Sequence, residues 1–588
     1  MKKWTFLIFL MRVYILGAQR TDTLLTAHVH GNGLDPLEER TSLDTITHSI
    51  GDIASYLQKD SRFQIRQYAP GSVATMNLGG ANSNQSRIMW EGVDISSMAS
   101  GVLDLSIVPS VLLTAKSIAS GSNAFLSGDK AMIGGLSLGW ATYTKPFFTT
   151  SFTANSIGLR SLVVQNGGKF SKIRYRSFVK TEQSTNDYNY TIGNTDFRMK
   201  GMEYSTLTLL QRYEGKLGRI QWDANIWYTD AMKNNRGSVL TSGNINHLKD
   251  RILRGILSTQ VGDWSGNFFF GKEWQSYTDT NSNINLRDTN TYDQLTLRLV
   301  KKGKRSQSSI SGSFIHAGGT SRRASLVQAT INHKQFLGKT VNAVLRSTLW
   351  NLKVYGGAQL NLIKDWKTTC HQLTAGTFYR VPTVNELFWL PGGNPNLKAE
   401  QSYGVKYSVQ GKLGVLNTYF STDQLYHNNL IQWTPSTNGM WQPENIEVAY
   451  TSSSSLISRY WSGKWANELS LTHQYSRVLQ AILSRNEGKS LLYRPDWNVV
   501  HTLTYETPGL DVQLRTNYLG KRQTLRDNSP LGEISGELWA DLSFAAAVWS
   551  KTNILVTVHN ITNANRTFFL NYPMPGRHYS ITIQLHSK

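Results

Sequence analysis

The sequence predicts an all-β transmembrane protein, in which a long antiparallel strand region closes into a barrel behind a short mixed α and β segment. Three observations lead to this prediction. From about residue 140 onward, polar and apolar side chains alternate with a period of two, and no helical block interrupts them. Beyond residue 18 there is no run of 18 apolar residues, and mean hydropathy is negative, which excludes a helical membrane protein. The chain nevertheless holds 17 Trp, 26 Tyr and 21 Phe, as the interfacial girdles of a barrel require.

The alternation is clearest in five segments, each of which is bounded on both sides by turn residues. They are 219–228 (RIQWDANIWY), 294–300 (QLTLRLV), 468–475 (ELSLTHQY), 512–518 (VQLRTNY) and 579–585 (YSITIQL). A soluble β-sandwich would show the same pattern in any one of them. Its extent over most of the chain favours closure, because an open sheet of that size would leave long reactive edges.

The segment before the barrel contains short elements separated by glycine-rich loops. Residues 52–57 (DIASYL) predict a short helix with Asp52 as its N-cap. Short strands are expected at 63–65, 87–90, 93–95 and 112–113. Glycines at 71, 79, 80, 92, 101, 121, 128, 134 and 135 allow tight turns and close backbone approaches that a Cβ would block.

Three motifs in this segment occur in an order that carries a family resemblance. They are MWEGVDI at 89–95, GVLDLSIVPSVL at 101–112 and SGSNAFLSGDKAMIGGLSL at 120–138. Together they resemble the plug domain of TonB-dependent outer-membrane receptors, which implies an α+β plug in the lumen of a barrel. One departure is that the usual Arg-Gly before the apical loop is here Leu78-Gly79-Gly80. The arginine latch of the plug is therefore missing at that point.

Two barrel segments support the same resemblance. RVPTVNELFWLPGGNPNLKAEQS at 380–402 resembles a family segment in which one strand ends, a loop turns, and Glu-X-Ser opens the next strand. NITNANRTFFLNYPMPGRHYSITIQL at 560–585 resembles the closing hairpin, with Pro573, Pro575 and Gly576 in the turn. The family implies a barrel of 22 antiparallel strands, at about 20 residues per strand and connection. The chain ends on His586-Ser587-Lys588 instead of an aromatic residue, which weakens the usual assembly signal.

The N-terminus resembles a secretory signal. Lys2 and Lys3 precede an apolar run at 4–10, and Leu16-Gly17-Ala18 offers a small-residue exit, although Arg12 interrupts the pattern. An uncleaved anchor is the alternative, but the run is too short to span about 30 Å of hydrocarbon as a helix. We expect a signal peptide at 1–18, a flexible segment at 19–39, the plug at 40–139 and the transmembrane barrel at 140–588.

The flexible segment contains DTLLTAHV, which resembles a TonB box in the form seen in cobalamin receptors. An extended segment with alternating apolar side chains can add a strand to the sheet edge of a partner and transmit force. The coupling residues implied by the resemblance are Asp22, Thr23, Leu24, Leu25, Thr26, Ala27, His28 and Val29.

By the same resemblance, the outward loops of the plug would form the floor of an extracellular binding cup. Tyr68 can stack on a ligand, and serine hydroxyls can hydrogen-bond it. The candidate substrate-binding residues are Tyr68, Ser72, Ser96, Ser97, Met98 and Ser100. The alternative is that these are ordinary turn residues.

The charge of the chain is +22, but Lys and Arg are spread along it without a block of five or six. This argues against a nucleic-acid partner. In an outer membrane, scattered cations could contact lipopolysaccharide phosphates or line a lumen that attracts anions. Solvated loop charge is the alternative. The single cysteine, Cys370, excludes an intrachain disulfide and a multi-cysteine metal site.

The resemblance implies a receptor in the outer membrane of a Gram-negative bacterium, energised by TonB and its proton-driven inner-membrane complex. The box form and the lack of long inserts favour a corrinoid such as cobalamin as the imported nutrient. A ferric siderophore or haem is the alternative ligand, and a passive porin the alternative class. No catalysis is expected, since no His-Glu-X-X-His pattern occurs and a plug would obstruct a site. No cofactor is required, and an accessory surface lipoprotein is a further candidate partner.

Overall fold

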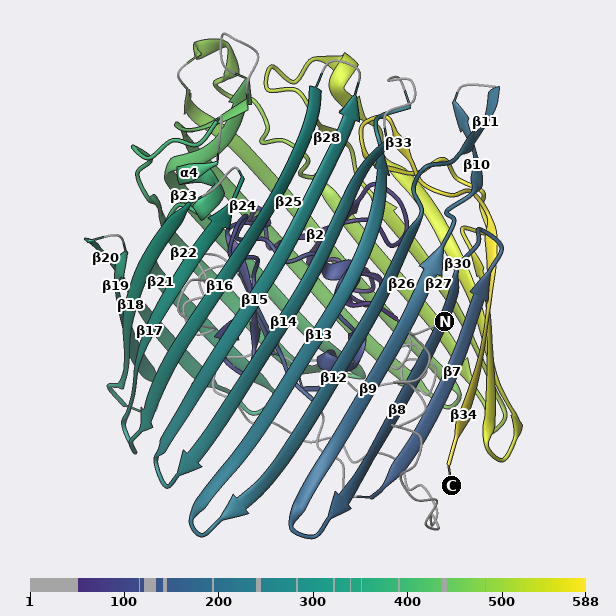
Figure 1. The fold of residues 1–588 in the computed structure, drawn as a ribbon, viewed down its shortest axis with the longest axis horizontal. Helices are drawn as coiled ribbons and strands as arrows, with labels where there is room; N and C mark the ends of the chain where they lie inside the picture. The colour runs from purple at the N-terminus through teal and green to yellow at the C-terminus, as the bar shows by residue number, and fades with distance from the viewer. Residues whose placement is uncertain are drawn as a thin grey trace.

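A computed structural model of the chain describes residues 51–115, 117–120, 134–140, 145–192, 195–239, 245–281, 284–320, 323–338, 340–350, 352–389, 392–435, 441–481 and 483–587. Over these residues the chain forms a closed antiparallel barrel of 22 strands with an N-terminal domain inside it (Figure 1). The predicted signal peptide, the TonB-box segment and residues 40–50 of the predicted plug lie outside the described residues.

Each barrel strand pairs with its sequence neighbour, and the last strand, β34, closes the ring by pairing with the first, β7. The strands are β7 (Phe147–Asn155), β8 (Arg160–Phe170), β9 (Ile173–Ser184), β12 (Tyr204–Leu217), β13 (Ile220–Arg236), β14 (Ile245–Val261), β15 (Trp264–Asn281), β16 (Ile284–Lys302), β17 (Ser306–Gly319), β18 (Ala324–Phe336), β19 (Val341–Trp350), β20 (Lys353–Asp365), β21 (Thr369–Arg380), β22 (Glu400–Leu413), β23 (Leu416–Pro435), β24 (Trp441–Ser462), β25 (Trp465–Ala481), β26 (Trp497–Glu506), β27 (Leu510–Leu519), β30 (Glu537–Trp549), β31 (Thr552–His559) and β34 (His578–His586). Full closure satisfies every strand edge, which a bilayer demands.

The side chains of the wall are arranged opposite to those of a soluble protein. In β16, Leu295 and Leu297 point outward and are 49% and 55% exposed, whereas Gln294 and Thr296 point inward and are buried. The alternation that predicted a strand therefore places its apolar face on the outside. This arrangement fits a wall in contact with lipid and contradicts the soluble sandwich that the periodicity alone left open.

The two ends of the barrel carry connections of different length. One end has short turns, such as residues 171–172 between β8 and β9, and the chain finishes there. The other end carries longer loops with their own elements (Figure 1): β10 (Tyr188–Ile192), β11 (Thr195–Met199), α4 (Val384–Phe388), η4 (Ser484–Asn486), β28 (Arg522–Gln523), η5 (Pro530–Gly532), β29 (Glu533–Ile534), β32 (Thr567–Phe569) and β33 (Tyr572–Pro573). Short turns of such barrels face the periplasm and longer loops face outward, so we call the ends periplasmic and extracellular.

The described residues between 51 and 140 form a domain inside the barrel, which is called the luminal domain below. It contains α3 (Ile53–Leu57), β1 (Phe63–Gln67), β2 (Ala74–Leu78), β3 (Ser86–Trp90), β4 (Val93–Asp94), η1 (Leu105–Ile107), η2 (Ser110–Ala115), β5 (Ser117–Ser120) and β6 (Gly134–Leu138). Strands β1 and β2 form a hairpin, and the other four form a sheet in the order β4-β3-β6-β5 with β3 and β6 parallel. The domain is thus α+β.

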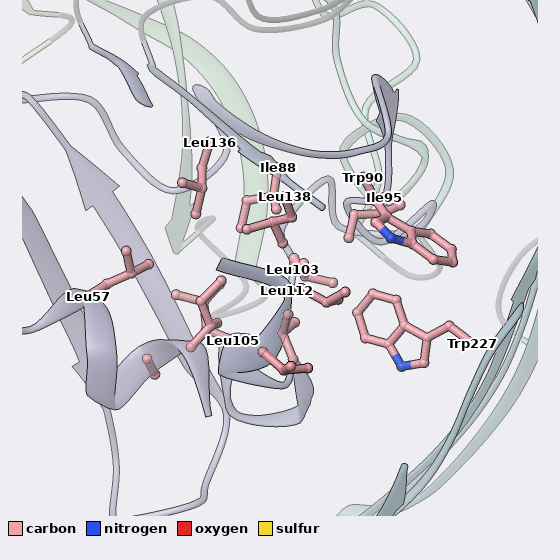
Figure 2. Close-up of a cluster of buried hydrophobic side chains, with 14 of the residues drawn as sticks. Leu57, Ile88, Trp90, Ile95, Leu103, Leu105, Leu112, Leu136, Leu138 and Trp227 are labelled. Atoms are coloured by element: carbon pink, nitrogen blue, oxygen red, sulfur yellow. The ribbon is translucent and has the colours of Figure 1, made fainter. Parts of the chain in front are cut away.

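A continuous apolar core joins the luminal domain to the wall. Leu57, Ile88 and Leu105 pack within the domain, and its Trp90 meets Trp227 of β13 edge to face, with ring centroids 5.6 Å apart (Figure 2). Both indoles are fully buried. Edge-to-face aromatic pairs of this kind add roughly 0.5–1.5 kcal/mol beyond the area they bury. The domain is therefore anchored to one side of the barrel by hydrophobic contact.

Most of the predicted short elements are present. Asp52 caps α3 by accepting a hydrogen bond from the Ser55 backbone amide at 2.7 Å. The strand predicted at 112–113 is wrong, because these residues lie in the 3₁₀ helix η2. Two apolar residues fit a strand or a buried helical turn equally well, and here Leu112 turns into the core of the domain. Within the described residues, no helix is both long and apolar enough to cross a membrane.

Candidate functional site

Three loops of the luminal domain reach the extracellular end of the barrel. Residues 68–73 connect β1 to β2, residues 79–85 connect β2 to β3, and residues 95–104 follow β4. In the first loop, the carbonyl of Pro70 accepts a hydrogen bond from the Asn186 side chain of the β9–β12 connection at 2.7 Å. In the third, the carbonyl of Ala99 accepts one from the Asn385 amide of α4 at 3.0 Å. The loops are thus held by extracellular connections.

Glycine permits two of these close approaches. Gly71 has a φ of +70°, and a Cβ on it would overlap the ring of Tyr204. Gly101 has a φ of +69°, and a Cβ would lie 2.6 Å from the Thr383 methyl carbon. L-residues with side chains rarely adopt this backbone conformation. The prediction of close backbone approaches at glycine is confirmed at these two positions.

The predicted substrate-binding residues all lie in the first and third loops, but the structure uses several of them internally. The Ser72 hydroxyl accepts from the Tyr68 and Ala69 amides and donates to the Ala69 carbonyl. The Ser97 hydroxyl donates to Glu273 of β15 at 3.1 Å. Ser96 and Met98 are buried, whereas Ser100 is exposed. Their role in ligand binding stays a prediction, with Tyr68 and Ser100 the better placed.

Around Tyr68 the structure gathers an aromatic cluster from three parts of the chain. Tyr68 stacks on Phe569 with ring centroids 4.3 Å apart and meets Tyr572 edge to face at 4.7 Å. Tyr493 meets Phe569 at 5.4 Å. The guanidinium of Arg66 lies 5.8 Å from the Tyr493 ring and 5.7 Å from the Phe569 ring. We call Tyr68, Tyr493, Phe569 and Tyr572 the aromatic cluster.

Two arginines beside the aromatic cluster have hydrogen-bonding capacity left over. Among the described residues, Arg66 Nε has no hydrogen-bond partner, and neither have Nε and Nη1 of Arg494. Their remaining bonds are long, from Arg66 to Asn77 at 3.3 Å and from Arg494 to Asn82 at 3.4 Å. Burial, together with the charge of Arg66, lowers the pKa of Arg494 to about 9, so it is still charged at neutral pH. Arg494 is buried and Arg66 half-buried, and neither forms an ion pair with a carboxylate of the described residues, so the two are suited to an anionic group.

Next to the second luminal loop, the barrel holds a buried ionic cluster. Arg380 donates to Glu386 at 2.9 and 3.1 Å and to Glu400 at 2.7 Å, and all three side chains are at most 3% exposed. The luminal domain reaches this cluster through neutral amides. Gln85 donates to Glu400 at 3.0 Å and Asn84 to Glu386 at 3.4 Å. We call Arg380, Glu386 and Glu400 the Arg380 cluster.

Comparison with known proteins relates this chain to vitamin B12 transporters. The chain is 21% identical over 499 residues, covering 78% of it and 76% of the relative, to the vitamin B12 transporter BtuB of Vibrio vulnificus. A second B12 transporter BtuB, from Photobacterium profundum, is 32% identical over 114 residues, covering 19% of this chain and 18% of the relative. No family model matches the chain.

Solved structures match over almost the whole chain. The siderophore receptor PirA of Acinetobacter baumannii matches with a TM-score of 0.71 at 12% identity, covering 93% of this chain and 100% of that one. The copper transporter OprC matches with a TM-score of 0.73 at 14% identity, covering 91% and 95%. The FrpB iron transporter of Neisseria meningitidis matches with a TM-score of 0.73 at 11% identity, covering 92% and 97%. The chain has the fold of a TonB-dependent outer-membrane receptor.

Relationship and fold together place this receptor in the outer membrane of a Gram-negative bacterium. It is a transport protein, not an enzyme. One Gly-X-Ser-X-Gly match does occur at 135–139, but Ser137 lies inside strand β6, between Met89 of β3 and Ser117 of β5. A nucleophile elbow requires a sharp strand-to-helix turn, so this match has no catalytic geometry. No group of three His, Cys, Asp or Glu in the described part of the receptor is placed to hold a metal ion.

Inside the receptor, the luminal domain is tied to opposite sides of the wall. On one side Asp104 and Ser106 bind Lys233 of β13, and the Ile95 carbonyl accepts from Arg254 of β14 at 2.9 Å. On the other side the Ser61 hydroxyl lies 2.8 Å from that of Ser470 in β25. Strands β13 and β25 face each other across the ring of strands. The domain therefore spans the lumen.

Sequence reasoning found the loops that reach the extracellular end but missed the most distinctive side chains there. Arg380 and Glu386 lay inside the segment at 380–402 that carried the resemblance, and the Thr-X-X-Glu capping box of α4 was a readable signal. Arg66 and Arg494 gave no local signal. Their proximity depends on the barrel bringing β1 beside the connection between β25 and β26.

Proposed function

We propose that this receptor binds a scarce nutrient at the extracellular end and imports it to the periplasm with energy supplied through TonB. The luminal domain acts as the plug. The observation that carries the proposal is that the domain spans the lumen between β13 and β25, held by many small polar contacts around an apolar core. Such a domain blocks passive flow but can be displaced by force.

Coupling is assigned to residues 22–29, which stay a prediction from the sequence. An extended segment that pairs with the sheet of TonB can transmit a pull along its backbone hydrogen bonds. It precedes α3 in the chain, so a pull on it reaches the luminal domain first. The proton gradient of the inner membrane supplies the energy through the TonB complex.

The preferred ligand is a corrinoid such as cobalamin. The support is the relationship to vitamin B12 transporters and the likeness of DTLLTAHV to the box of cobalamin receptors. A ferric siderophore is the second candidate, favoured by the structural neighbours PirA and FrpB and by the nitrogens of Arg66 and Arg494 that lack a hydrogen-bond partner among the described residues. Both ligand classes can present an anionic group to Arg66 and Arg494, and a planar face to the aromatic cluster. Haem remains a third candidate of the same receptor class.

A passive porin, the rival from another class, would need an open lumen. The contacts of the luminal domain with both β13 and β25 argue against it. A porin would also be indifferent to a change in the segment at 22–29. The following experiment separates the two classes and tests the ligand.

Uptake and surface binding of radiolabelled cyanocobalamin are measured in cells that carry the receptor or its Leu25→Pro variant. Asn32→Pro, in the same flexible segment but outside the box, is the matched control. We expect uptake by the parent and the control, and surface binding without uptake by Leu25→Pro, because proline removes a backbone donor from strand pairing. Uptake unaffected by Leu25→Pro would refute the coupling assignment.

The proposed contact of the ligand with Arg66 and Arg494 is tested with a double variant, Arg66→Gln combined with Arg494→Gln. The matched control is Arg160→Gln, at an exposed extracellular position. We expect surface binding to weaken at least roughly tenfold in the double variant, since charge-assisted hydrogen bonds contribute about 1.5–3 kcal/mol each. If the parent binds an iron chelate and not cyanocobalamin, the ligand of this site is a ferric siderophore instead of a corrinoid.

A further inference from the structure

The positive charge of the receptor is concentrated at the periplasmic end. Exposed lysines and arginines occupy its turns and the adjoining strand ends, whereas Asp263 is the exposed acidic residue of the described turns, and carboxylates of the strand ends such as Glu214, Asp223 and Glu468 are half-buried. Asp365 is exposed at the end of β20. The basic residues, called the basic ring below, are Lys169, Lys172, Lys216, Arg219, Lys301, Lys302, Lys304, Arg305, Lys364, Lys367, Lys412, Lys464 and Lys551.

None of the basic ring residues forms an ion pair with a carboxylate of the described residues. The extracellular end also has exposed cations, but it has exposed carboxylates among them, at Asp196, Glu487, Asp527 and Glu533. Some of its cations are paired within the protein. Arg198 pairs with Asp187 at 2.5 Å and Arg251 with Asp230 at 3.1 Å. The net charge of +22 therefore has a preferred end, which the even spread of Lys and Arg along the sequence did not reveal.

Aromatic side chains place the basic ring at the level of a membrane interface. The ammonium of Lys301 lies 5.1 Å from the Trp264 ring, that of Lys364 5.5 Å from Trp366, and that of Lys464 6.0 Å from Tyr505. Trp264 and Trp366 are more than half exposed on the outside of the wall. Tryptophan and tyrosine prefer the headgroup level of a bilayer, and lysines extend from there into the polar layer.

We propose that the basic ring binds the phosphate groups of acidic phospholipids in the periplasmic leaflet of the outer membrane. The ring follows the circumference of the barrel, directly beyond the apolar band that includes Leu295 and Leu297. A surface that combines unpaired lysines, interfacial indoles and lipid-facing leucines matches a lipid with an acyl chain and an anionic headgroup. This inference is independent of which nutrient the receptor imports.

The geometry favours a lipid over an acidic protein as the occupant. A protein partner would contact one sector of the rim, whereas the cations are distributed over the turns of β8–β9, β12–β13, β16–β17, β20–β21, β24–β25 and β30–β31. A leaflet surrounds the barrel on all sides and can meet every one of these turns. The attraction between one basic residue and anionic headgroups raises the local concentration of anionic lipid about fivefold.

The test compares trace amounts of spin-labelled phosphatidylglycerol and phosphatidylcholine beside the full-length receptor in phosphatidylcholine bilayers. Electron spin resonance gives the relative association of the two lipids with the barrel. The ring variant replaces seven cations by glutamine: Lys172, Lys216, Lys301, Lys304, Lys367, Lys464 and Lys551. The matched control neutralises seven exposed cations at the extracellular end: Arg160, Lys200, Arg287, Arg323, Lys353, Lys398 and Arg577.

We expect the parent and the control to prefer phosphatidylglycerol roughly fivefold, and the ring variant to fall close to equal association. Raising the salt concentration should reduce the preference of the parent, because headgroup charges are screened. Heat-modifiable gel mobility verifies that each variant has a folded barrel. Equal association in the parent, or a preference that the ring variant keeps, overturns the proposal. A ring variant that keeps its lipid preference but loses binding to the periplasmic domain of TonB assigns the ring to a protein partner instead.

Discussion

Replacing Arg380 by glutamine should loosen the extracellular contact between the barrel and its luminal domain. The guanidinium of Arg380 is the shared partner of Glu386 and Glu400, with donor–acceptor distances of 2.7 to 3.1 Å. Glu386 in turn closes the capping box of α4, and Glu400 accepts from Gln85 and from the Ile431 amide. One substitution therefore affects a helix, a strand end and the second luminal loop.

The size of the effect follows from burial. Removing one member of a buried ion pair costs about 3–5 kcal/mol, because the remaining charge has no compensation and little water. Here two carboxylates, each at most 2% exposed, would lose their cation together. The free energy of local opening around α4 should fall by a similar amount. This corresponds to a rise of about a hundred- to several-thousand-fold in the hydrogen-exchange rate.

Hydrogen exchange followed by mass spectrometry on the receptor in lipid nanodiscs measures this directly. Peptides that cover α4 and Ile431 should exchange faster in Arg380→Gln, while peptides of β13 on the opposite wall should not change. A second variant, in which Arg380→Met is combined with Glu386→Gln and Glu400→Gln, has no charge left within the Arg380 cluster and should recover most of the protection. The reasoning is refuted if Arg380→Gln changes exchange by less than about tenfold, or if the neutral triple variant exchanges as fast.

Three further predictions concern the luminal domain. In a Cys370→Ser background, a disulfide between Ser61→Cys and Ser470→Cys should abolish uptake but not surface binding, and a reductant should restore it, because the two hydroxyls lie 2.8 Å apart. Gly71→Ala should destabilise its loop by about 1–3 kcal/mol more than the control Gly218→Ala destabilises its own turn. Gly218 also has a positive φ, +58°, but there is open space around it. Hydrogen-exchange rates of the two loops measure the difference. Burial raises the pKa of Glu91 to about 7, so the domain should lose stability as pH rises from about 4.5 through 7 and then level off; Glu91→Gln should remove this pH dependence of protease resistance.

The strands of the barrel could be predicted because their signal is local. In 294–300, each outward leucine is separated from the next by one inward side chain, and β16 shows this alternation in three dimensions. Four of the five segments chosen from the sequence lie within barrel strands, and the fifth, 219–228, begins one residue before β13. The number of strands was not local information, since it depends on how far the sheet must curl before β34 meets β7. It came from the family resemblance and is confirmed.

The site was harder to predict because its members meet only after closure. Arg66 and Tyr493 are separated by more than two thirds of the chain, yet they contact each other through a guanidinium and a ring. The 3₁₀ helix η2 was mistaken for a strand for a related reason, since Leu112 responds to the core around it and not to its neighbours in sequence. Ser72 was chosen for its hydroxyl, but that hydroxyl stabilises its own turn.

The two sides of the lumen differ in a way that indicates where the luminal domain yields. Toward β13 it is held by the Trp90–Trp227 contact within a continuous apolar core and by the buried pairing of Asp104 with Lys233. Toward β25 and β26 the contacts are neutral hydrogen bonds, such as that from Asn498 to the Ser61 carbonyl at 2.7 Å. Water can replace hydroxyl and amide partners at little cost, whereas separating a packed apolar face costs about 25 cal/mol for each Å² exposed. A pull transmitted through α3 should therefore detach the domain first along β25 and β26, next to Arg494 and the aromatic cluster, where the ligand is proposed to bind.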